Sequence, residues 1–455
     1  KVNAEAYSGV ALSLAKRRQW RCCVDSPALL QFAAEHRLRC LRVMTYGFNC
    51  ARQVTSLEWL TELCIDGSSH NSLDLGQLVL PPRLVTLEFK HLGFLVLPPL
   101  PDATLKRLVW REGGGYRLAR RTGPLPSSLL HLQCNMSDAK LELPDLPPFL
   151  QHLDLSRSRL RTRVLPALPA TLRHLSVPRC DLTQLPDNLP LQLTHLDCGW
   201  NALTALPALP KTLVYLDCSS NSLIVPLLDL PDTLLHLSCR CNNLTALPAL
   251  PAGLRFLKCE VNQLTSLPPL PVALEELHCG RNDLTTFPIP LPPNLKYLRC
   301  SYNYLRRLPA LPRTLEFLEC SVQRNGMEEL PALHDTALAE LCCQGNGLRT
   351  IPSLPETLKR MFCSGNALTS LPALPGRLEY LDFSGNALTS LPALPDGLTY
   401  LECDEGLLDG VDLPQALRTC EIPRLGEESS DEAESSLGEE EEESSGEDEE
   451  EGGQW

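Results

Sequence analysis

Leucines along most of this chain recur in one pattern, and residues 215–223, with the sequence YLDCSSNSL, are an example of it. The full pattern is L-x-x-L-x-C-x-x-N-x-L, and the asparagines of its regular copies follow one another at steps of 20 to 22 residues. Within L-x-x-L-x-C the apolar and polar positions alternate with a period of two, which predicts a short strand with one buried face. Because the copies succeed one another at a nearly constant interval, we expect their strands to pair in parallel, about 4.8 Å apart.

The pattern divides into regular, weaker and partial copies. The regular copies begin at Leu193, Leu213, Leu234, Leu254, Leu274, Leu295, Leu315, Leu338, Leu358, Leu378 and Leu398. Their asparagines are Asn201, Asn221, Asn242, Asn262, Asn282, Asn303, Asn325, Asn346, Asn366 and Asn386. Weaker copies begin at Leu60, Leu84, Leu105, Leu129, Leu150 and Leu172, and partial ones at Leu38 and Leu417. About 17 full units and two partial ones therefore form a leucine-rich repeat array.

The parts of the unit outside the strand have their own physical requirements. The asparagine turns the chain, and a column of buried amides can satisfy turn backbone groups that would otherwise lack partners. The rest of each unit reads LPALP, as in residues 206–210, and its prolines exclude a helix. We expect this arm to run as polyproline II on the convex side, opposite a parallel sheet on the concave side.

A complete unit such as LPALPKTLVYLDCSSNSLIV (206–225) resembles the proline-rich leucine-rich repeats, about 20 residues long, of bacterial type III secretion effectors. In that family L-P-x-L-P is followed by L-x-x-L-x-V-x-x-N-x-L. The resemblance implies a solenoid that holds a protein target. One branch of the family carries a C-terminal ubiquitin-ligase domain with a catalytic cysteine. This sequence departs from the family by placing cysteine where valine is usual, and no such domain follows the repeats.

These features predict five segments. Residues 1–37 form an N-terminal cap, partly helical, in which Ser26 caps a helix over 25–37 and Pro27 takes its first position. Divergent repeats occupy 38–140 and regular repeats 141–403. Residues 404–426 form a C-terminal cap, with a closing strand over 417–425. Residues 427–455 form an acidic tail that is disordered by composition.

Charge is concentrated in that tail. Residues 427–451 hold 15 acidic side chains and no basic one, so the chain's net charge of −14 leaves about +1 for the rest. A nearly neutral body does not predict nucleic-acid binding, which requires a basic patch or stripe. The tail either keeps the protein soluble or contacts basic proteins.

Hydropathy and cysteine usage bear on location. No run of 18 apolar residues predicts a membrane span, and no signal peptide is recognisable. Regularly spaced cysteines without a secretory signal indicate free thiols in a reducing compartment. We expect an intracellular, cytoplasmic protein. A location in the cytoplasm of a host cell is compatible with this expectation.

The cysteine of the pattern is a packing residue in this interpretation. Phe383, Val177 and Leu155 replace it in other units, so the position requires an apolar side chain. A straight column spaced one strand apart cannot surround zinc tetrahedrally. We expect no metal and no cofactor. Cys180 stands at an asparagine position, whereas Cys241 and Cys342 fall where an exposed thiol could be reactive.

Catalytic chemistry has little support in the sequence. Cys403 precedes Asp404 and Glu405 but falls in the predicted buried column, where a thiol is inert. The glycines at 113–115 lack the Lys-Ser/Thr of a phosphate-binding loop. We therefore expect a protein that is not an enzyme.

The positions that vary between units carry the functional prediction. The residue before the second leucine of each strand faces the concave surface and is often aromatic, although strand propensity alone also favours aromatic residues. Aromatic residues and arginine dominate binding hot spots. The predicted partner-binding residues are His195, Trp200, Tyr215, His236, Phe256, Tyr297, Tyr302, Phe317, Arg360, Tyr380 and Tyr400.

We interpret the chain as a non-enzymatic scaffold that binds a protein partner on the concave face. Two alternatives remain open at this stage. The chain is the substrate-recognition part of an effector or ubiquitin-ligase system, or it is a structural or virion assembly component.

Overall fold

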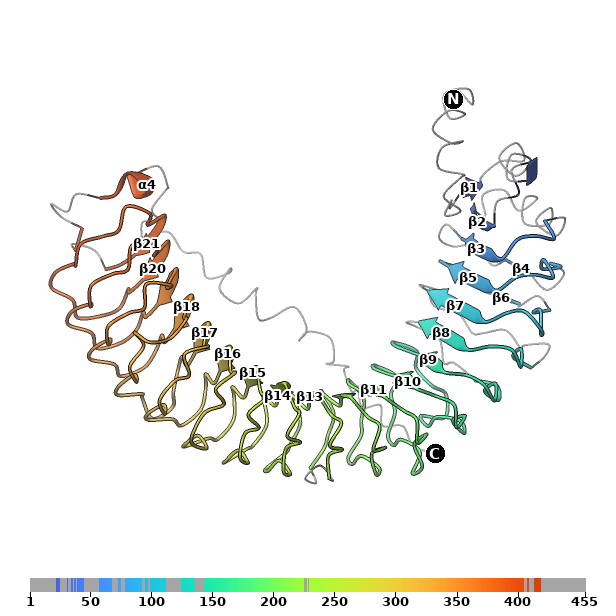
Figure 1. The fold of residues 1–455 in the computed structure, drawn as a ribbon, viewed down its shortest axis with the longest axis horizontal. Helices are drawn as coiled ribbons and strands as arrows, with labels where there is room; N and C mark the ends of the chain where they lie inside the picture. The colour runs from blue at the N-terminus through green and yellow to red at the C-terminus, as the bar shows by residue number, and fades with distance from the viewer. Residues whose placement is uncertain are drawn as a thin grey trace, which may run out of the picture.

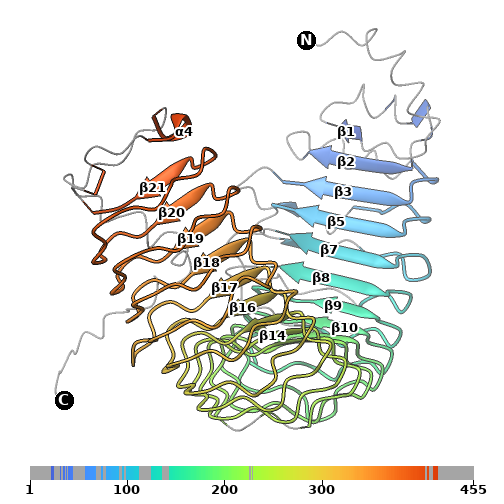
Figure 2. The same ribbon diagram turned by 60° about the vertical axis from the view of Figure 1, so that its left-hand side comes forward.

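The protein was analysed as a computed structural model that describes residues 22–24, 31, 34–35, 37, 39–44, 57–67, 73–74, 78–91, 95–96, 99–111, 124–135, 143–224, 227, 229–404, 407–408 and 413–418. Its coils follow one another along an arc, and the strands lie along the inner side of that arc (Figure 1). The same coils, turned in Figure 2, show the strands as one continuous ladder. The architecture is a parallel β-solenoid.

Within the described residues, one sheet of 19 strands runs through the solenoid. Its first strands are β1 (Cys22–Val24), β2 (Cys40–Met44), β3 (Glu62–Asp66), β5 (Thr86–Lys90), β7 (Arg107–Arg111) and β8 (His131–Asn135). Three-residue strands follow: β9 (His152–Asp154), β10 (His174–Ser176), β11 (His195–Asp197), β12 (Tyr215–Asp217), β13 (His236–Ser238), β14 (Phe256–Lys258), β15 (Glu276–His278), β16 (Tyr297–Arg299), β17 (Phe317–Glu319), β18 (Glu340–Cys342), β19 (Arg360–Phe362), β20 (Tyr380–Asp382) and β21 (Tyr400–Glu402). Neighbouring strands pair in parallel, and each residue is opposite its equivalent in the next unit, as Tyr215 is opposite His195. Each of the 17 predicted full units contributes one strand of this sheet.

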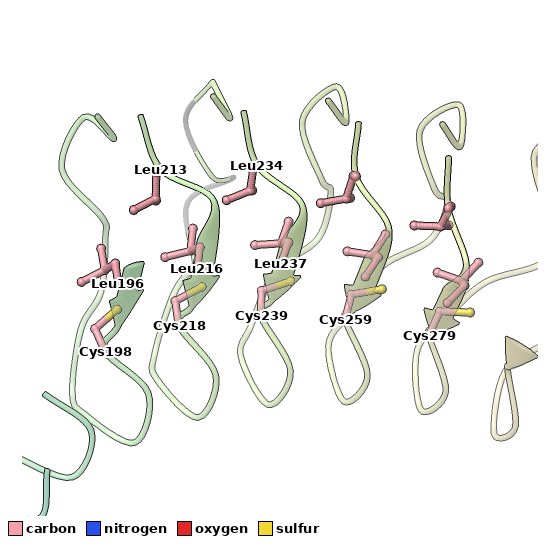
Figure 3. Close-up of a cluster of buried hydrophobic side chains, with 14 of the residues drawn as sticks. Leu196, Cys198, Leu213, Leu216, Cys218, Leu234, Leu237, Cys239, Cys259 and Cys279 are labelled. Atoms are coloured by element: carbon pink, nitrogen blue, oxygen red, sulfur yellow. The ribbon is translucent and has the colours of Figure 1, made fainter. Parts of the chain in front are cut away.

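Burial follows the predicted two-residue alternation. Leu216, in the middle of β12, is fully buried, and so is Cys218 just beyond the strand. Figure 3 shows these leucines and cysteines pointing to the same side of successive strands. Packing of one unit against the next therefore builds a single continuous core.

The cysteine column belongs to that core. Cys198, Cys218 and Cys239 are fully buried, and Phe383 occupies the same register in its own unit, also fully buried. Burial raises the pKa of these thiols; for Cys320, in the same column, it does so to about 12. The cysteines of the column therefore stay protonated at neutral pH and pack as small apolar side chains.

Asparagine side chains hold the turn after each strand. The Nδ2 group of Asn221 donates to the carbonyls of Cys218, Ser219 and, one unit earlier, Cys198. Its Oδ1 accepts a hydrogen bond from the Leu203 amide over 3.0 Å. In the unit before Asn201, Cys180 takes this place, and its thiol donates to the Leu155 carbonyl over 3.0 Å.

One asparagine of the predicted column was assigned wrongly. Gln323, and not Asn325, fills the position in the unit that begins at Leu315. Its Nε2 donates to the carbonyls of Cys300 and Cys320, and its Oε1 accepts from the Leu305 amide over 3.1 Å. The chain then makes an extra turn at residues 324–325, which displaces Asn325 from the column.

The residue just before the asparagine position has a left-handed backbone. Its φ angle is between 51° and 63° in twelve successive units. These residues are Arg157, Arg179, Trp200, Ser220, Cys241, Val261, Arg281, Tyr302, Val322, Gly345, Gly365 and Gly385. We call them the left-handed column; only the last three are glycine, the residue for which this conformation costs least.

Among the described residues of the units from Leu193 to Leu398, the proline arms contain neither helix nor strand. Their inner leucines, such as Leu206 and Leu247, are buried against the core. The arms therefore close each coil with apolar side chains and not with a second layer of regular structure.

The two ends differ in part from the prediction. The sheet extends back to β1, which pairs with β2 and lies in the segment assigned to the N-terminal cap. Of the predicted helix over 25–37, the described residues 31, 34 and 35 are helical, and most of the others lie outside the described residues. A separate two-stranded sheet, β4 (Leu73–Asp74) with β6 (Leu95–Val96), was not predicted.

The predicted strand at the C-terminal end is wrong at its first residues. Residues Gln415–Arg418 form a helical turn, α4, with Leu417 buried. Pro414 lies immediately before this turn, where a proline is compatible with a helix start, and the residues that follow it favour helix. Residues 419–455, which include the acidic tail, lie outside the described residues.

Candidate functional site

The predicted partner-binding residues fall into two columns. The first residue of each strand from β8 to β21 forms what we call the ring column. It consists of His131, His152, His174, His195, Tyr215, His236, Phe256, Glu276, Tyr297, Phe317, Glu340, Arg360, Tyr380 and Tyr400. Nine of the eleven predicted residues belong to it. Trp200 and Tyr302 lie instead in the left-handed column, on the loops after β11 and β16.

The N-terminal part of the ring column, from His131 to His236, is a continuous stack of rings, which we call the ring ladder. Ring centroids are 4.0 Å apart between His131 and His152, and again between His152 and His174 and between His174 and His195. Tyr215 continues the stack at 4.1 Å from His195, with the two rings only 8° from parallel. The stack then loosens to 4.5 Å at His236 and, tilted, to 5.7 Å at Phe256.

The predicted partner-binding residues did not include the first three members of the ring ladder. His131, His152 and His174 hold the same register in the weaker units that begin at Leu129, Leu150 and Leu172. The signal was therefore present, one residue before the second leucine, and the weaker repeats obscured it.

The imidazoles of the ring ladder are uncharged at neutral pH. Burial, followed by repulsion from Arg107, lowers the pKa of His131 to about 4. Burial and the neighbouring imidazoles lower the pKa of His152 to about 3 and that of His195 to about 4. The ladder thus presents a neutral aromatic surface whose ring edges can donate and accept hydrogen bonds.

A second outward column borders the ladder with carboxylates. Asp154, Asp197 and Asp217 are the last residues of β9, β11 and β12. Burial raises the pKa of Asp197 to about 6, with a further contribution from the nearby Asp217. Neutral rings and acidic side chains therefore lie next to each other on this part of the strand face.

In the middle of the array, charged side chains on the strands and just before them form ion pairs between neighbouring units. Glu275 accepts from Arg255 over 2.6 Å and pairs with Lys296 over 3.2 Å. Further along, Arg299 is 3.6 Å from Glu319, and Arg360 is 3.4 Å from Glu340. Arg360, which was predicted to bind a partner, therefore already has a carboxylate neighbour.

Aromatic residues return at the C-terminal end of the face. Tyr380 and Tyr400 stack at 4.0 Å and 5° from parallel, and Phe362 lies 4.7 Å from Tyr380. Between the two aromatic regions, Tyr297 and Phe317 are a looser pair at 6.3 Å, and Tyr297 is 38% exposed.

The loop residues Trp200 and Tyr302 share one arrangement. The guanidinium of Arg179 lies over the Trp200 ring at 4.4 Å from its centroid, and that of Arg281 lies over Tyr302 at 5.2 Å. In each pair the arginine precedes the ring by one unit in the left-handed column. Both rings are therefore held in place by cation–π contacts before any partner binds.

Among the described residues, no group of three or more histidine, cysteine, aspartate or glutamate side chains could hold a metal ion. No helix that the coordinates describe is long and apolar enough to cross a membrane. Burial, with a contribution from Glu340, raises the pKa of Cys342, so this thiol carries little of the reactive thiolate form.

A parallel solenoid whose units repeat buried leucines, a turn asparagine and a proline arm defines a leucine-rich repeat protein. Two solved structures of YopM are similar to it. YopM from Yersinia enterocolitica WA-314 has 28% identity over 83% of this chain and 94% of its own, with a TM-score of 0.56. YopM from Yersinia pestis, described as a leucine-rich effector protein, has 30% identity over 73% of this chain and 88% of its own, with a TM-score of 0.57. The chain belongs to this family of leucine-rich repeat proteins.

A third structure shares the fold alone. The functional domain of InlJ from Listeria monocytogenes, described as including a cysteine ladder, has 24% identity over 67% of this chain and 68% of its own, with a TM-score of 0.55. No protein-family model matches the sequence, and no curated protein matches it either.

Proposed function

We propose that this protein is a non-enzymatic scaffold that binds a protein partner along the strand face of its solenoid. The observation that carries the proposal is the ring ladder, in which neutral aromatic side chains of successive strands stack 4.0 to 4.5 Å apart. Half-exposed aromatic rings are the side chains that contribute most to protein interfaces. Leucine-rich repeat arrays present extended surfaces of this kind, and YopM of Yersinia pestis is described as an effector protein.

The ladder is suited to binding because it is ordered in advance. Each ring is fixed between two others, and its strand is fixed by pairing on both sides. Docking on such a surface costs little side-chain entropy, so more of the contact energy appears as affinity. The flanking Asp154, Asp197 and Asp217 favour a partner segment that combines apolar groups with basic side chains.

The first prediction concerns three aromatic residues of the strand face. Affinity purification with mass spectrometry identifies the partner, and calorimetry then measures its dissociation constant. Changing Tyr215, Phe256 and Tyr297 together to Ala is expected to raise this constant about tenfold or more, because their rings lie on the outward side of β12, β14 and β16. The fold should persist, since the core leucines are untouched.

A matched control uses three exposed apolar residues on the arms. Leu191, Val272 and Ile289 are 82%, 67% and 79% exposed, and their change to Ala removes a similar kind of side chain. This control should bind within about twofold of the wild type. An unchanged affinity in the triple aromatic variant, or equal losses in both variants, would refute binding by the strand face.

A further inference from the structure

A second surface lies on the loop after β9 and is rich in arginine. Residues 157–163 read RSRLRTR, with arginine at every second position. All four arginines are exposed, whereas the residues between them include the buried Ser158 and Leu160. We call Arg157, Arg159, Arg161 and Arg163 the arginine loop.

The arginine loop departs from the regular unit. Four residues separate the buried Leu160 from the buried Leu165, whereas two separate the equivalent Leu203 and Leu206. The additional length includes a tight turn, in which the Arg163 amide donates to the Leu160 carbonyl over 3.1 Å. Insertions within repeat arrays often lie on a binding face.

The backbone conformation of two residues of the arginine loop does not favour arginine. Arg157 and Arg163 have φ angles of 62° and 54°, a region in which glycine or asparagine is the favourable residue. Arginine gives the turn no conformational advantage there. The backbone conformation at these two positions therefore does not account for the choice of arginine.

The next unit adds a fifth guanidinium. Arg179 follows Arg157 in the left-handed column, and the loops touch, since the Arg157 amide donates to the Pro178 carbonyl over 2.8 Å. The Trp200 ring holds the Arg179 side chain in position. Asp181 lies 3.6 Å from Arg159, but both side chains are mostly exposed, at 47% and 66%, so this surface pair contributes little.

The size of the patch indicates the kind of ligand. Two adjacent units span about 10 Å at the strand spacing, which accommodates a few closely spaced anionic groups. Guanidinium groups bind carboxylates through paired hydrogen bonds. Nucleic acid requires a longer basic stripe, and the column continues with the uncharged Trp200, Ser220 and Cys241.

We propose that the arginine loop, together with Arg179, binds a short acidic peptide segment of a protein partner. This site is separate from the ring ladder and does not depend on the function proposed for it. Residues 427–451 of the chain, with 15 acidic side chains and no basic one, are an example of a segment with the required chemistry.

The test measures binding of a short, fluorescently labelled oligoglutamate peptide to the full chain by fluorescence anisotropy. The loop variant combines Arg157→Gln, Arg159→Gln, Arg161→Gln and Arg163→Gln. We expect its dissociation constant to rise about tenfold or more relative to the wild type. Added salt should weaken wild-type binding, because the contacts are ionic.

The control variant removes the same charge elsewhere. It combines Arg281→Gln, Arg306→Gln, Arg307→Gln and Arg313→Gln, all at exposed positions, and should bind within about twofold of the wild type. Circular dichroism melting of both variants verifies that each is folded. Equal weakening in the two variants would show that only overall charge matters and would overturn the proposal.

Two further measurements distinguish binding of an acidic peptide from the alternatives. The first repeats the titration in a chain whose acidic residues at 427–451 are changed to Gln and Asn, so that this segment cannot compete; absence of binding there overturns the proposal. The second uses a labelled DNA duplex. If the duplex binds more tightly than the peptide and loses its affinity in the loop variant, the site is for nucleic acid and the proposal is wrong.

Discussion

In each of twelve successive units, the residue immediately before the asparagine position takes the left-handed backbone whichever side chain it carries. Val261 and Val322 do so with φ angles of 53° and 52°, although this region is least favourable for β-branched residues. The surrounding hydrogen bonds impose it: the Val322 amide donates to the Gln344 carbonyl over 2.8 Å. The sequence could not predict this, because a valine gives no sign of a positive φ.

The second prediction compares two substitutions of Val322. Val322→Gly is expected to be more stable than Val322→Ala by about 1 kcal/mol, because both remove the side chain and only alanine retains the left-handed strain. Chemical denaturation measures the difference. Glycine already occupies this position in three later units, at Gly345, Gly365 and Gly385.

The control for this comparison is Val272, which is 67% exposed and is not among the residues with positive φ. There the order should reverse, with alanine more stable than glycine, because glycine loses more entropy on folding. The same order at both positions would mean that the left-handed backbone of Val322 stores no strain.

The strand and its asparagine turn are the elements that the sequence predicted best. The period of two identifies the strands, and the 20-residue step places them in register. Gln323 and Asn325 show the limit of this reasoning, because two amide side chains two residues apart compete for one position. Only the geometry of the extra turn decides between them.

The third prediction concerns a fully buried turn asparagine. The Nδ2 group of Asn303 donates to the carbonyls of Cys279, Cys300 and Ser301, and its Oδ1 accepts from the Leu284 amide. Asn303→Ala leaves these backbone groups without partners and should lower the free energy of unfolding by about 3 kcal/mol or more. Urea denaturation measures the loss.

Asn303→Gln is the informative comparison, because Gln323 fills the same position in the next unit. It should retain part of the stability that Asn303→Ala loses. A variant Asn303→Ala as stable as the wild type would show that water replaces the amide, and the buried column would then not stabilise the turns.

The terminal elements were the least predictable. β1 precedes the first leucine of the pattern, and α4 includes the first two residues of an expected strand. At the ends a unit has one neighbour, so the requirement for repeat residues is relaxed and local helix propensity decides.

At the scale of the whole molecule, the coils lie on an arc with the strands inside (Figure 1). Ring centroids of successive histidines from His131 to His195 are 4.0 Å apart, closer than the usual strand spacing of about 4.8 Å. Side chains that point into an arc converge, which accounts for the shorter distance. The repeat register predicted which residues share this face, but their stacking depends on curvature, which no single unit specifies.

The fourth prediction follows from the pKa values of the ring ladder. Histidine in an unfolded chain has a pKa near 6.5, whereas that of His152 is about 3 and those of His131 and His195 are about 4. Between these values the unfolded chain binds protons that the folded ladder excludes. The free energy of unfolding should therefore fall as pH decreases from about 6.5 to about 4.

Charged groups next to the ring ladder also contribute to the pH dependence of stability, so the measurement requires a comparison between variants. Arg107 opposes protonation and Asp154 favours it, while Asp197, with its raised pKa of about 6, contributes in the opposite sense. The comparison is therefore between the wild type and a variant with His131, His152 and His195 changed to Phe. Its denaturation midpoint should fall less than that of the wild type between about pH 7 and about pH 4.5.

His334→Phe is the control, since its side chain is 55% exposed and lies outside the ring ladder. It should reproduce the pH dependence of the wild type. If the triple variant loses stability on acidification as steeply as the wild type does, the stacked imidazoles are not the source of the acid sensitivity.

The buried cysteine column has a consequence for how the protein fails. While the chain is folded, the column keeps its thiols protonated and away from oxidants. Once the chain opens, many thiols become available together, and their number allows a very large set of mismatched disulfides. In an oxidising medium a single unfolding event would then be irreversible. The lifetime of the protein there would be governed by the rate at which it opens and not by its equilibrium stability.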